Sequence, residues 1–288
     1  MKLGYLTGDL AAFEKARRIG YESLELFATA FGDPWETPPD RDKIGETRAL
    51  MKRHDIALSA IAYYRRACRP EEVEPMHTAL MRVFDAAEAL GVRTVGAMSG
   101  FNSDLDWDGN IRFFADKFGP IAEEAERRGL RVAFENWMAA AHGPLPFHPT
   151  NMGGCPDTWD DWFRAVPSKA LGIEFDPSHL YWQGIDPMRA LREYRDRIYH
   201  VHAKDTEILE EQRYRRGING GFFRFRIPGY GAIDWTEFIS VLDEIGYTGG
   251  VAIEHEDPVY SGDRFDEGLI RGWQVLHPLI HPGSGRAD

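Results

Sequence analysis

Residues 171–175 read Leu-Gly-Ile-Glu-Phe, and a segment with helical spacing follows at 187–195. A mostly apolar run of this length is typical of a strand that is buried on both faces. The next such run, at 198–203, again leads to a helical segment, at 235–245. Strands that alternate with helices in this way indicate a parallel sheet whose outside is covered by the helices.

The same unit recurs along the whole chain. Strands are expected at 3–6, 23–27, 57–63, 92–97, 131–134, 171–175, 198–203 and 250–253, and helices at 12–19, 42–54, 75–90, 110–128, 158–165, 187–195, 235–245 and 266–276. Eight units in fewer than 300 residues predict a single α/β domain, a (β/α)8 TIM barrel over 1–280, with a frayed tail at 281–288. A doubly wound sheet is the alternative, but no G-x-G-x-x-G follows the first strand. Long loops are expected after strand five (136–157) and strand seven (205–234), over the mouth where barrel enzymes keep their sites.

Composition narrows the classes of function. The 288 residues include 34 Lys and Arg against 46 Asp and Glu, a formal net charge of −12. Such a chain repels phosphate backbones and anionic lipid, so we expect neither nucleic-acid nor membrane binding. No signal peptide is recognisable, and Cys68 and Cys155 are interpreted as reduced thiols, which predicts a cytoplasmic protein. A homo-oligomer or a complex with a second subunit stays open.

Ionisable residues end four successive predicted strands. These residues are Glu135, Asp176, His202 and Glu254. A single such residue is usually an exposed charge at the rim, but four of them converging at the barrel axis need a neutralising cation. One His with oxygen ligands suits Mn²⁺ best, with Mg²⁺, Co²⁺ or Zn²⁺ as alternatives. His200 shares a strand face with His202 but lies farther from the mouth, and His255 is expected to point away from the axis.

The motifs at these positions occur in a characteristic order. They are Phe134-Glu135-Asn136, Phe175-Asp176-Pro177-Ser178-His179, His200-Val201-His202-Ala203-Lys204-Asp205, the segment 227–235 and Ile253-Glu254-His255-Glu256-Asp257. In this order they resemble the xylose-isomerase-like sugar phosphate isomerase/epimerase superfamily of TIM barrels. The superfamily includes ketose 3-epimerases, inosose dehydratases and enzymes that process keto-glycosides. The resemblance spans nearly the whole chain and is strongest over 130–258.

The resemblance implies roles for individual residues. The metal would be held by Glu135, Asp176, His202 and Glu254, and His179 would contact the substrate. The chain differs from two relatives of this type. It lacks the histidines on early strands that three-zinc DNA-repair nucleases need, and it lacks the Arg that epimerases carry soon after the metal-binding His. Arg224 or Arg226 in the long loop is expected to replace that Arg.

These features predict a metal-dependent sugar isomerase or epimerase that works through an enediolate. Glu135 and Glu254 would act as base and acid on opposite faces of a keto-sugar. Predicted substrate contacts are Asn136, Trp137, His179, Lys204 and Arg226. Aromatic residues around the mouth favour a neutral sugar, although packing between loops explains them equally well. The alternatives are a lyase of the same barrel, either inosose dehydratase-like or cleaving 3-keto-glycosides or C-glycosides by β-elimination, and a non-catalytic sugar-binding subunit.

Overall fold

A computed structural model describes residues 1–138, 151–218 and 221–282. Residues 139–150, 219–220 and 283–288 lie outside the described part. Eight parallel strands close into a barrel in the order β1-β10-β7-β6-β5-β4-β3-β2. The strands are β1 (Lys2–Thr7), β2 (Ser23–Phe27), β3 (Ala57–Tyr63), β4 (Thr94–Ala97), β5 (Arg131–Glu135), β6 (Leu171–Phe175), β7 (Ile198–Ala203) and β10 (Gly250–Ile253). The predicted TIM barrel is therefore confirmed.

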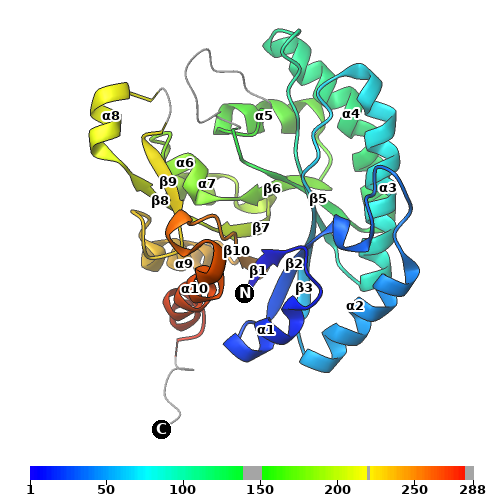
Figure 1. The fold of residues 1–288 in the computed structure, drawn as a ribbon. Helices are drawn as coiled ribbons and strands as arrows, with labels where there is room; N and C mark the ends of the chain where they lie inside the picture. Colours follow the sequence, from blue (N-terminus) through cyan, green and yellow to red (C-terminus); the bar gives the residue numbers. More distant parts are fainter. Residues whose placement is uncertain (139–150, 219–220, 283–288) are drawn as a thin grey trace.

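Helices surround this barrel on its outside (Figure 1). They are α1 (Ala12–Ile19), α2 (Arg41–His54), α3 (Val73–Leu90), α4 (Trp107–Arg128), α5 (Pro156–Ala165), α6 (Pro177–Tyr181), α7 (Pro187–Glu193), α9 (Trp235–Glu244) and α10 (Phe265–Ile280). Short 3-10 turns occur at η1 (Ala28–Phe31), η2 (Pro70–Glu72), η3 (Arg195–Arg197), η4 (Pro258–Tyr260) and η5 (Gly262–Arg264). Within the described residues, no helix has the length and apolar character that crossing a bilayer requires.

Helix ends and core packing follow from the sequence. Gly20, Gly91 and Gly129 end α1, α3 and α4 with φ values of 107°, 70° and 67°, a left-handed conformation in which glycine carries no steric penalty. Between helices and barrel lies an aromatic core, where Phe114 stacks on Trp162 with ring centroids 5.0 Å apart. Such packing orients the strands, and the strands in turn fix which side chains face the barrel axis.

The segment after β7 is more ordered than the sequence analysis predicts. Residues 205–234, expected as one long loop, contain β8 (Asp205–Ile208), α8 (Glu210–Arg216) and β9 (Phe223–Arg226). The two strands pair antiparallel, with Asp205 opposite Arg226 and Ile208 opposite Phe223. Arg224 pairs with Glu207 across the hairpin, so opposite charges on facing strands support it. In Figure 1 the hairpin and α8 project from the body of the barrel.

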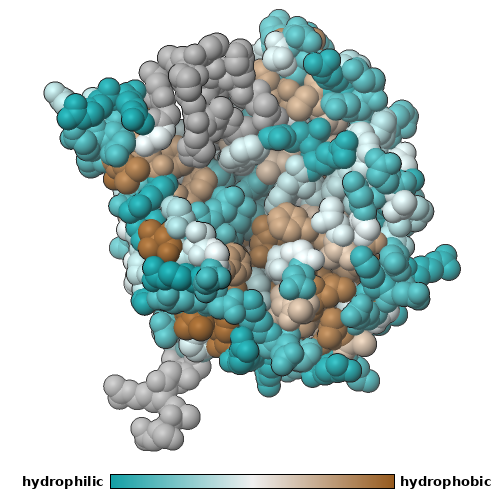
Figure 2. Space-filling view, viewed as in Figure 1, coloured by the Kyte–Doolittle hydropathy of each residue, from teal (hydrophilic) through white to brown (hydrophobic). Residues whose placement is uncertain are grey.

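Two predicted segments fall partly outside the described residues. Of the expected loop at 136–157, only 136–138 and 151–157 are described, and α5 begins at Pro156. Of the predicted tail, 283–288 is likewise outside. The face of the molecule in Figure 2 is mainly hydrophilic with separate hydrophobic patches. Among the described residues, the most exposed large apolar side chains, Tyr214 and Ile218, lie in and just after α8.

Candidate metal centre at the barrel mouth

The four predicted metal ligands converge at the carboxyl ends of four adjacent strands. Glu135 ends β5, Asp176 follows β6, His202 lies in β7 and Glu254 follows β10, and one ligand atom from each lies within 4.8 Å of the others. Three of them are buried, and the side chain of Glu254 is 14% exposed. The strand ends therefore bring together the set of residues that the sequence analysis identifies.

The donor atoms of this group suit a divalent cation. His202 Nδ1 lies 3.2 Å from Glu254 Oε2 and 3.6 Å from Glu135 Oε1. His202 Nδ1 is buried and makes no hydrogen bond with any described residue, and buried Asp176 Oδ2 is paired with the Lys204 ammonium at 3.1 Å. Buried carboxylates and lone pairs that face one another need a positive charge among them. Three carboxylates and one imidazole are ligands that Mn²⁺, Mg²⁺, Co²⁺ and Zn²⁺ accept, so the residues fit such an ion.

Lys204, predicted to contact the substrate, supplies part of the positive charge. Its buried ammonium lies 2.5 Å from Glu254 Oε2, 3.1 Å from Asp176 Oδ2 and 3.1 Å from Glu256 Oε2. Burial opposes the charged form, but Asp176 and Glu254 outweigh it and hold the pKa of Lys204 well above its usual value. Burial likewise acts against ionised Glu254, but the nearby Lys204 lowers the pKa of that carboxyl overall. Lys204 therefore favours the ionised form of Glu254 at the mouth.

His179 also lies against the predicted ligands. Its Nε2 is 3.4 Å from both Glu135 Oε1 and Asp176 Oδ2, and neither ring nitrogen makes a hydrogen bond with a described residue. The edge of the ring faces Phe225, 5.3 Å away between centroids. His179 thus offers free hydrogen-bonding capacity beside the carboxylates, and its role toward a substrate stays a prediction.

Two other predicted substrate contacts have partners inside the protein. Asn136 Nδ2 donates to the carbonyl of Asp176 at 2.9 Å, and its Oδ1 accepts from the Asp176 amide at 2.6 Å, which joins the ends of β5 and β6. Arg226 pairs with Asp257 at 2.9 Å and with Glu207, so it braces the β8–β9 hairpin. Both side chains are thus held by partners within the protein, and their contact with a substrate stays a prediction.

The structure also shows where the predicted aromatic residues and His255 lie. Trp137 is half-buried beside the site, with the Arg66 guanidinium 5.1 Å from its ring centroid. Trp182 stacks on Phe223 at 4.7 Å, so part of the aromatic mouth is packing between loops. His255 stacks on Phe265 of α10 at 4.2 Å, which agrees with the expectation that it points away from the axis.

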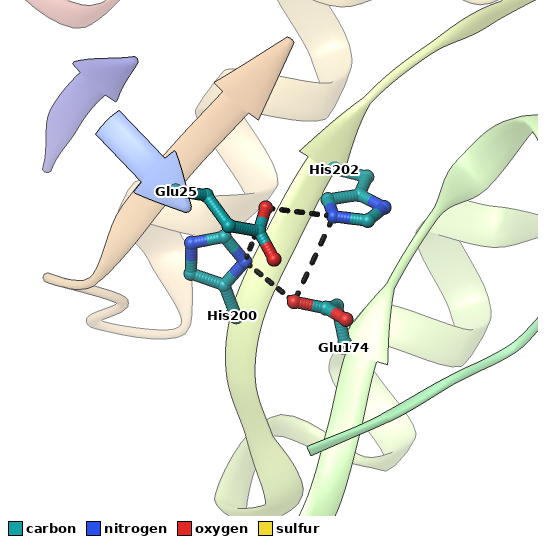
Figure 3. A group of neighbouring side chains, drawn as sticks. All are labelled: Glu25, Glu174, His200 and His202. Carbon is teal, nitrogen blue, oxygen red and sulfur yellow. Dashed lines mark hydrogen bonds and ion pairs between the residues drawn. The ribbon is translucent and has the colours of Figure 1, made fainter. Parts of the chain in front are cut away.

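A second polar group, which the sequence analysis does not predict as a site, lies deeper in the barrel. Glu25 of β2, Glu174 of β6 and His200 of β7 are completely buried beside His202 (Figure 3). His200 Nδ1 lies 2.9 Å from Glu174 Oε1, and His202 Nε2 lies 2.9 Å from Glu25 Oε2. Burial and the Glu25 carboxylate raise the pKa of Glu174 to about 7. Burial acts against ionised Glu25 too, but His202 and His200 lower its pKa to about 2.

The sequence does contain a signal for this interior group. Side chains alternate along a strand, so Glu174 shares the inward face with Asp176, two residues later, just as His200 shares it with His202. Glu25 stands between Leu24 and Leu26 in an otherwise apolar run, where a carboxylate needs a buried partner. The partner comes from β6 and β7, far away in the sequence.

The sequence of this chain matches those of known proteins with the same kind of barrel. A family model described as xylose isomerase-like TIM barrel matches residues 13–271. An uncharacterized protein, YfiH, of Bacillus subtilis is 26% identical over 91% of this chain and 94% of its own length. An inosose dehydratase of Clostridium botulinum is 38% identical, but over only 59% of this chain and 57% of the relative.

Solved structures share the fold at low sequence identity. A D-psicose 3-epimerase from Clostridium cellulolyticum superimposes with a TM-score of 0.74 at 16% identity and covers 98% of this chain and 100% of its own. An IolI protein with a bound zinc atom superimposes with a TM-score of 0.75 at 18% identity, over 99% of this chain and 100% of the other. At these identities the likeness concerns the fold.

Proposed function

This chain belongs to the xylose isomerase-like TIM barrel family, and from that premise we propose that it is a divalent-metal-dependent epimerase or isomerase of a keto-sugar or sugar derivative. The observation that carries the proposal is the convergence of Glu135, Asp176, His202 and Glu254 at the barrel mouth. Mn²⁺ is the ion we favour, because three carboxylates and a single imidazole form a predominantly oxygen ligand set.

The proposed reaction needs an acidic C–H group in the substrate, a general base and a general acid. When bound, the divalent ion polarises the substrate carbonyl and stabilises the charge of the enediolate that forms next to it. Glu135 and Glu254 come from β5 and β10, on either side of His202. One carboxylate removes the proton on one face, and the other returns it on the opposite face. His179, whose ring nitrogens make no hydrogen bond with a described residue, hydrogen-bonds a substrate oxygen.

Dehydration of a cyclic keto-polyol is the second candidate. The match to an inosose dehydratase is one support for it. The other is Lys204, whose ammonium lies 2.5 Å from Glu254 Oε2. A fixed positive charge beside the base suits elimination, because it stabilises the enolate from which the β-hydroxyl leaves.

One screen distinguishes the two candidates. The purified protein is incubated with Mn²⁺ in D₂O and with a panel of ketohexoses, 3-keto-glycosides and inososes, and the products are followed by NMR and mass spectrometry. Deuterium at the carbon next to the carbonyl, with the carbon skeleton and all hydroxyls retained, supports epimerisation or isomerisation. Loss of water or of an aglycone supports the lyase. Full turnover in excess chelator, with no bound metal found, contradicts both.

Variants separate proton transfer from metal binding. We expect Glu135→Gln and Glu254→Gln, each saturated with Mn²⁺, to exchange deuterium at least ~10²-fold more slowly than the wild type, because proton-transfer groups typically contribute that much. Glu244→Gln is the matched control, since Glu244 is paired with Arg192 at the surface. Near-normal exchange in either site variant would leave that residue as a ligand only.

A further inference from the structure

The two ring nitrogens of His202 face different surroundings. Nδ1 faces the barrel mouth, toward Glu254 and Glu135. Nε2 faces the interior, 2.9 Å from Glu25 Oε2 and 3.2 Å from the Tyr64 hydroxyl (Figure 3 shows the contact with Glu25). A neutral imidazole has one N–H and one lone pair, so only one of the two nitrogens can bind a metal.

The Tyr64 hydroxyl determines which nitrogen carries the proton. It lies 2.6 Å from Glu174 Oε2 and 3.0 Å from Glu25 Oε1, and both are carboxylate oxygens. Its single proton therefore goes to a carboxylate, and its oxygen presents a lone pair to His202 Nε2. Nε2 thus faces two acceptors, the tyrosine oxygen and Glu25 Oε2. The ring proton belongs on Nε2, and the lone pair on Nδ1 points to the mouth.

The barrel interior leaves room for this arrangement. Glu25 reaches His202 across the barrel axis, because β2 and β7 are not neighbours in the sheet. Barrel interiors are usually filled with branched apolar side chains. Here a Cβ added at Gly96 of β4 would lie 2.7 Å from Glu174 Oε2, so the glycine leaves the space that the interior carboxylate occupies.

We propose that Glu25 is a positioning residue that holds the proton on His202 Nε2 and so directs Nδ1 to the metal. This inference rests on the proposed function, because it takes the mouth group as the metal site. Within the mouth group Glu25 contacts His202, at Nε2 on the side away from the mouth, and acts through the imidazole. A carboxylate that accepts from the far nitrogen of a metal-binding histidine fixes the ring and raises the basicity of the ligating nitrogen.

A rival interpretation places a second ion in the interior itself. Glu25, Glu174, His200 and His202 each offer an atom within 4.8 Å of the others. That ion would take His202 Nε2 as a ligand, and the nitrogen would then have no proton to donate to Glu25. The two interpretations therefore differ in metal stoichiometry and in the protonation of Nε2.

The test uses Zn²⁺ as a diamagnetic probe on the full chain. Its affinity is measured by competition with a chromogenic chelator for the wild type and for Glu25→Gln, Glu25→Asp and Glu174→Gln. In Glu25→Gln the amide oxygen accepts from Tyr64 and the NH₂ group turns toward Nε2, which moves the ring proton to Nδ1. We expect Zn²⁺ to bind this variant ~10 to 100-fold more weakly, and Glu25→Asp to recover part of the loss.

Glu174→Gln is the matched control. It is equally buried in the same layer, but the Glu174 oxygen lies 3.7 Å from Nε2, too far to hold the proton there. We expect Zn²⁺ affinity close to that of the wild type. ¹⁵N NMR of the Zn²⁺-loaded wild type should show a proton on His202 Nε2. Melting curves establish that each variant is folded.

The outcomes separate the inference from the proposed function. Wild-type protein that binds no Zn²⁺ contradicts the proposed function itself. One equivalent bound, with folded Glu25→Gln binding as tightly as the wild type or with Nε2 unprotonated, overturns the role of Glu25 alone. Two equivalents of Zn²⁺ in the wild type and one in Glu174→Gln would show that the interior group is itself a metal site. That result also overturns the positioning role of Glu25.

Discussion

Each charged side chain at the mouth can be buried only because neighbouring charges offset its own. Glu135, Asp176 and Glu254 would repel one another in a buried site, and the Lys204 ammonium offsets only part of that charge. The remaining negative charge is what a divalent cation bound here would neutralise. His179 differs from these residues because it lies 3.4 Å from two carboxylates without a hydrogen bond to any described residue.

His179→Asn tests whether this histidine binds substrate or only packs. Removing the imidazole leaves the four proposed metal ligands in place, so deuterium exchange should persist while the proposed hydrogen bond to substrate is lost. We expect the KM of the Mn²⁺-loaded enzyme to rise about tenfold, the value of one hydrogen bond to a partly charged group, with kcat changing less. The control is His54→Asn at the end of α2. A lost kcat with unchanged KM would instead place His179 in the proton transfer.

The mouth group could be predicted from the sequence, and the interior group could not be assembled from it. Glu135, Asp176 and Glu254 stand at strand ends, and the carboxyl ends of barrel strands meet at one place. Glu25 and Glu174 lie inside strands, where only the register across the barrel shows that they meet. The prediction of Asn136 rests on its place in a motif, and that of Arg226 on its place in a long loop where an Arg is otherwise missing. Neither position gives information on the hydrogen bonds that the side chain makes within the protein.

At the scale of the elements, helix α4 is hydrogen-bonded to the loops that follow β3 and β4. Lys117 of α4 is buried, and its Nζ donates to the carbonyls of Ala67 at 2.7 Å and Ser99 at 2.6 Å. Burial lowers the pKa of Lys117 from 10.5 to about 7, and Cys68 and Glu72 oppose that shift. A neutral amine still has two N–H groups, so it can serve both carbonyls.

Lys117 makes a testable contribution to the pH dependence of stability. Between pH 7 and 10.5 the unfolded chain keeps the lysine proton while the folded chain releases it, so the free energy of unfolding rises with pH in this window. We expect a slope of up to about 1.4 kcal/mol per pH unit in the wild type relative to Lys117→Met. Urea unfolding at several pH values measures the difference. Parallel curves for the two proteins would contradict the shift.

One carboxylate, that of Asp205 in β8, joins the hairpin to the segment that leads to α9. Asp205 accepts from the backbone amides of Thr206, Gly229, Gly231 and Ile233 and from Trp235 Nε1, at 2.8 to 3.1 Å. A Cβ on Gly231 would lie 2.3 Å from Asp205 Oδ1, so glycine is needed for this close approach. β8 and β9 form a hairpin because of these contacts and strand pairing, which no local periodicity indicates.

Asp205→Asn should destabilise the hairpin and the segment after it. The amide can no longer accept on both sides, and its NH₂ group opposes backbone donors. We expect the free energy of unfolding to fall by about 3 kcal/mol, since bonds to a charged acceptor each contribute roughly 1.5 to 3. Glu207→Gln on the same hairpin is partly exposed and should cost roughly 1 kcal/mol or less. Equal losses in both variants would show that Asp205 does not organise this segment.

At the scale of the whole molecule, the eight strand–helix units could be predicted from the hydrophobic pattern alone. Each unit contains its own apolar strand and its own helix, so the pattern repeats along the chain. Barrel closure then brings residues from β5, β6, β7 and β10 to one point. A cation held there would link four of the eight strands. Metal binding and global stability should therefore be coupled.

Thermal melting measures that coupling. A ligand that binds only the folded state stabilises it by RT ln(1 + [L]/Kd), about 2.7 kcal/mol at one hundred times Kd. The chelator-treated protein should therefore melt at lower temperature, and added Mn²⁺ should raise its Tm in a concentration-dependent way. Asp176→Asn should lose this rise, because a neutral amide is a poorer ligand for a hard cation. Asp161→Asn, which removes a carboxylate paired with Arg164 at the surface, should keep it. If Mn²⁺ raised the Tm of Asp176→Asn as much as that of the wild type, the ion would be binding elsewhere, and the link between the four strands would be ruled out.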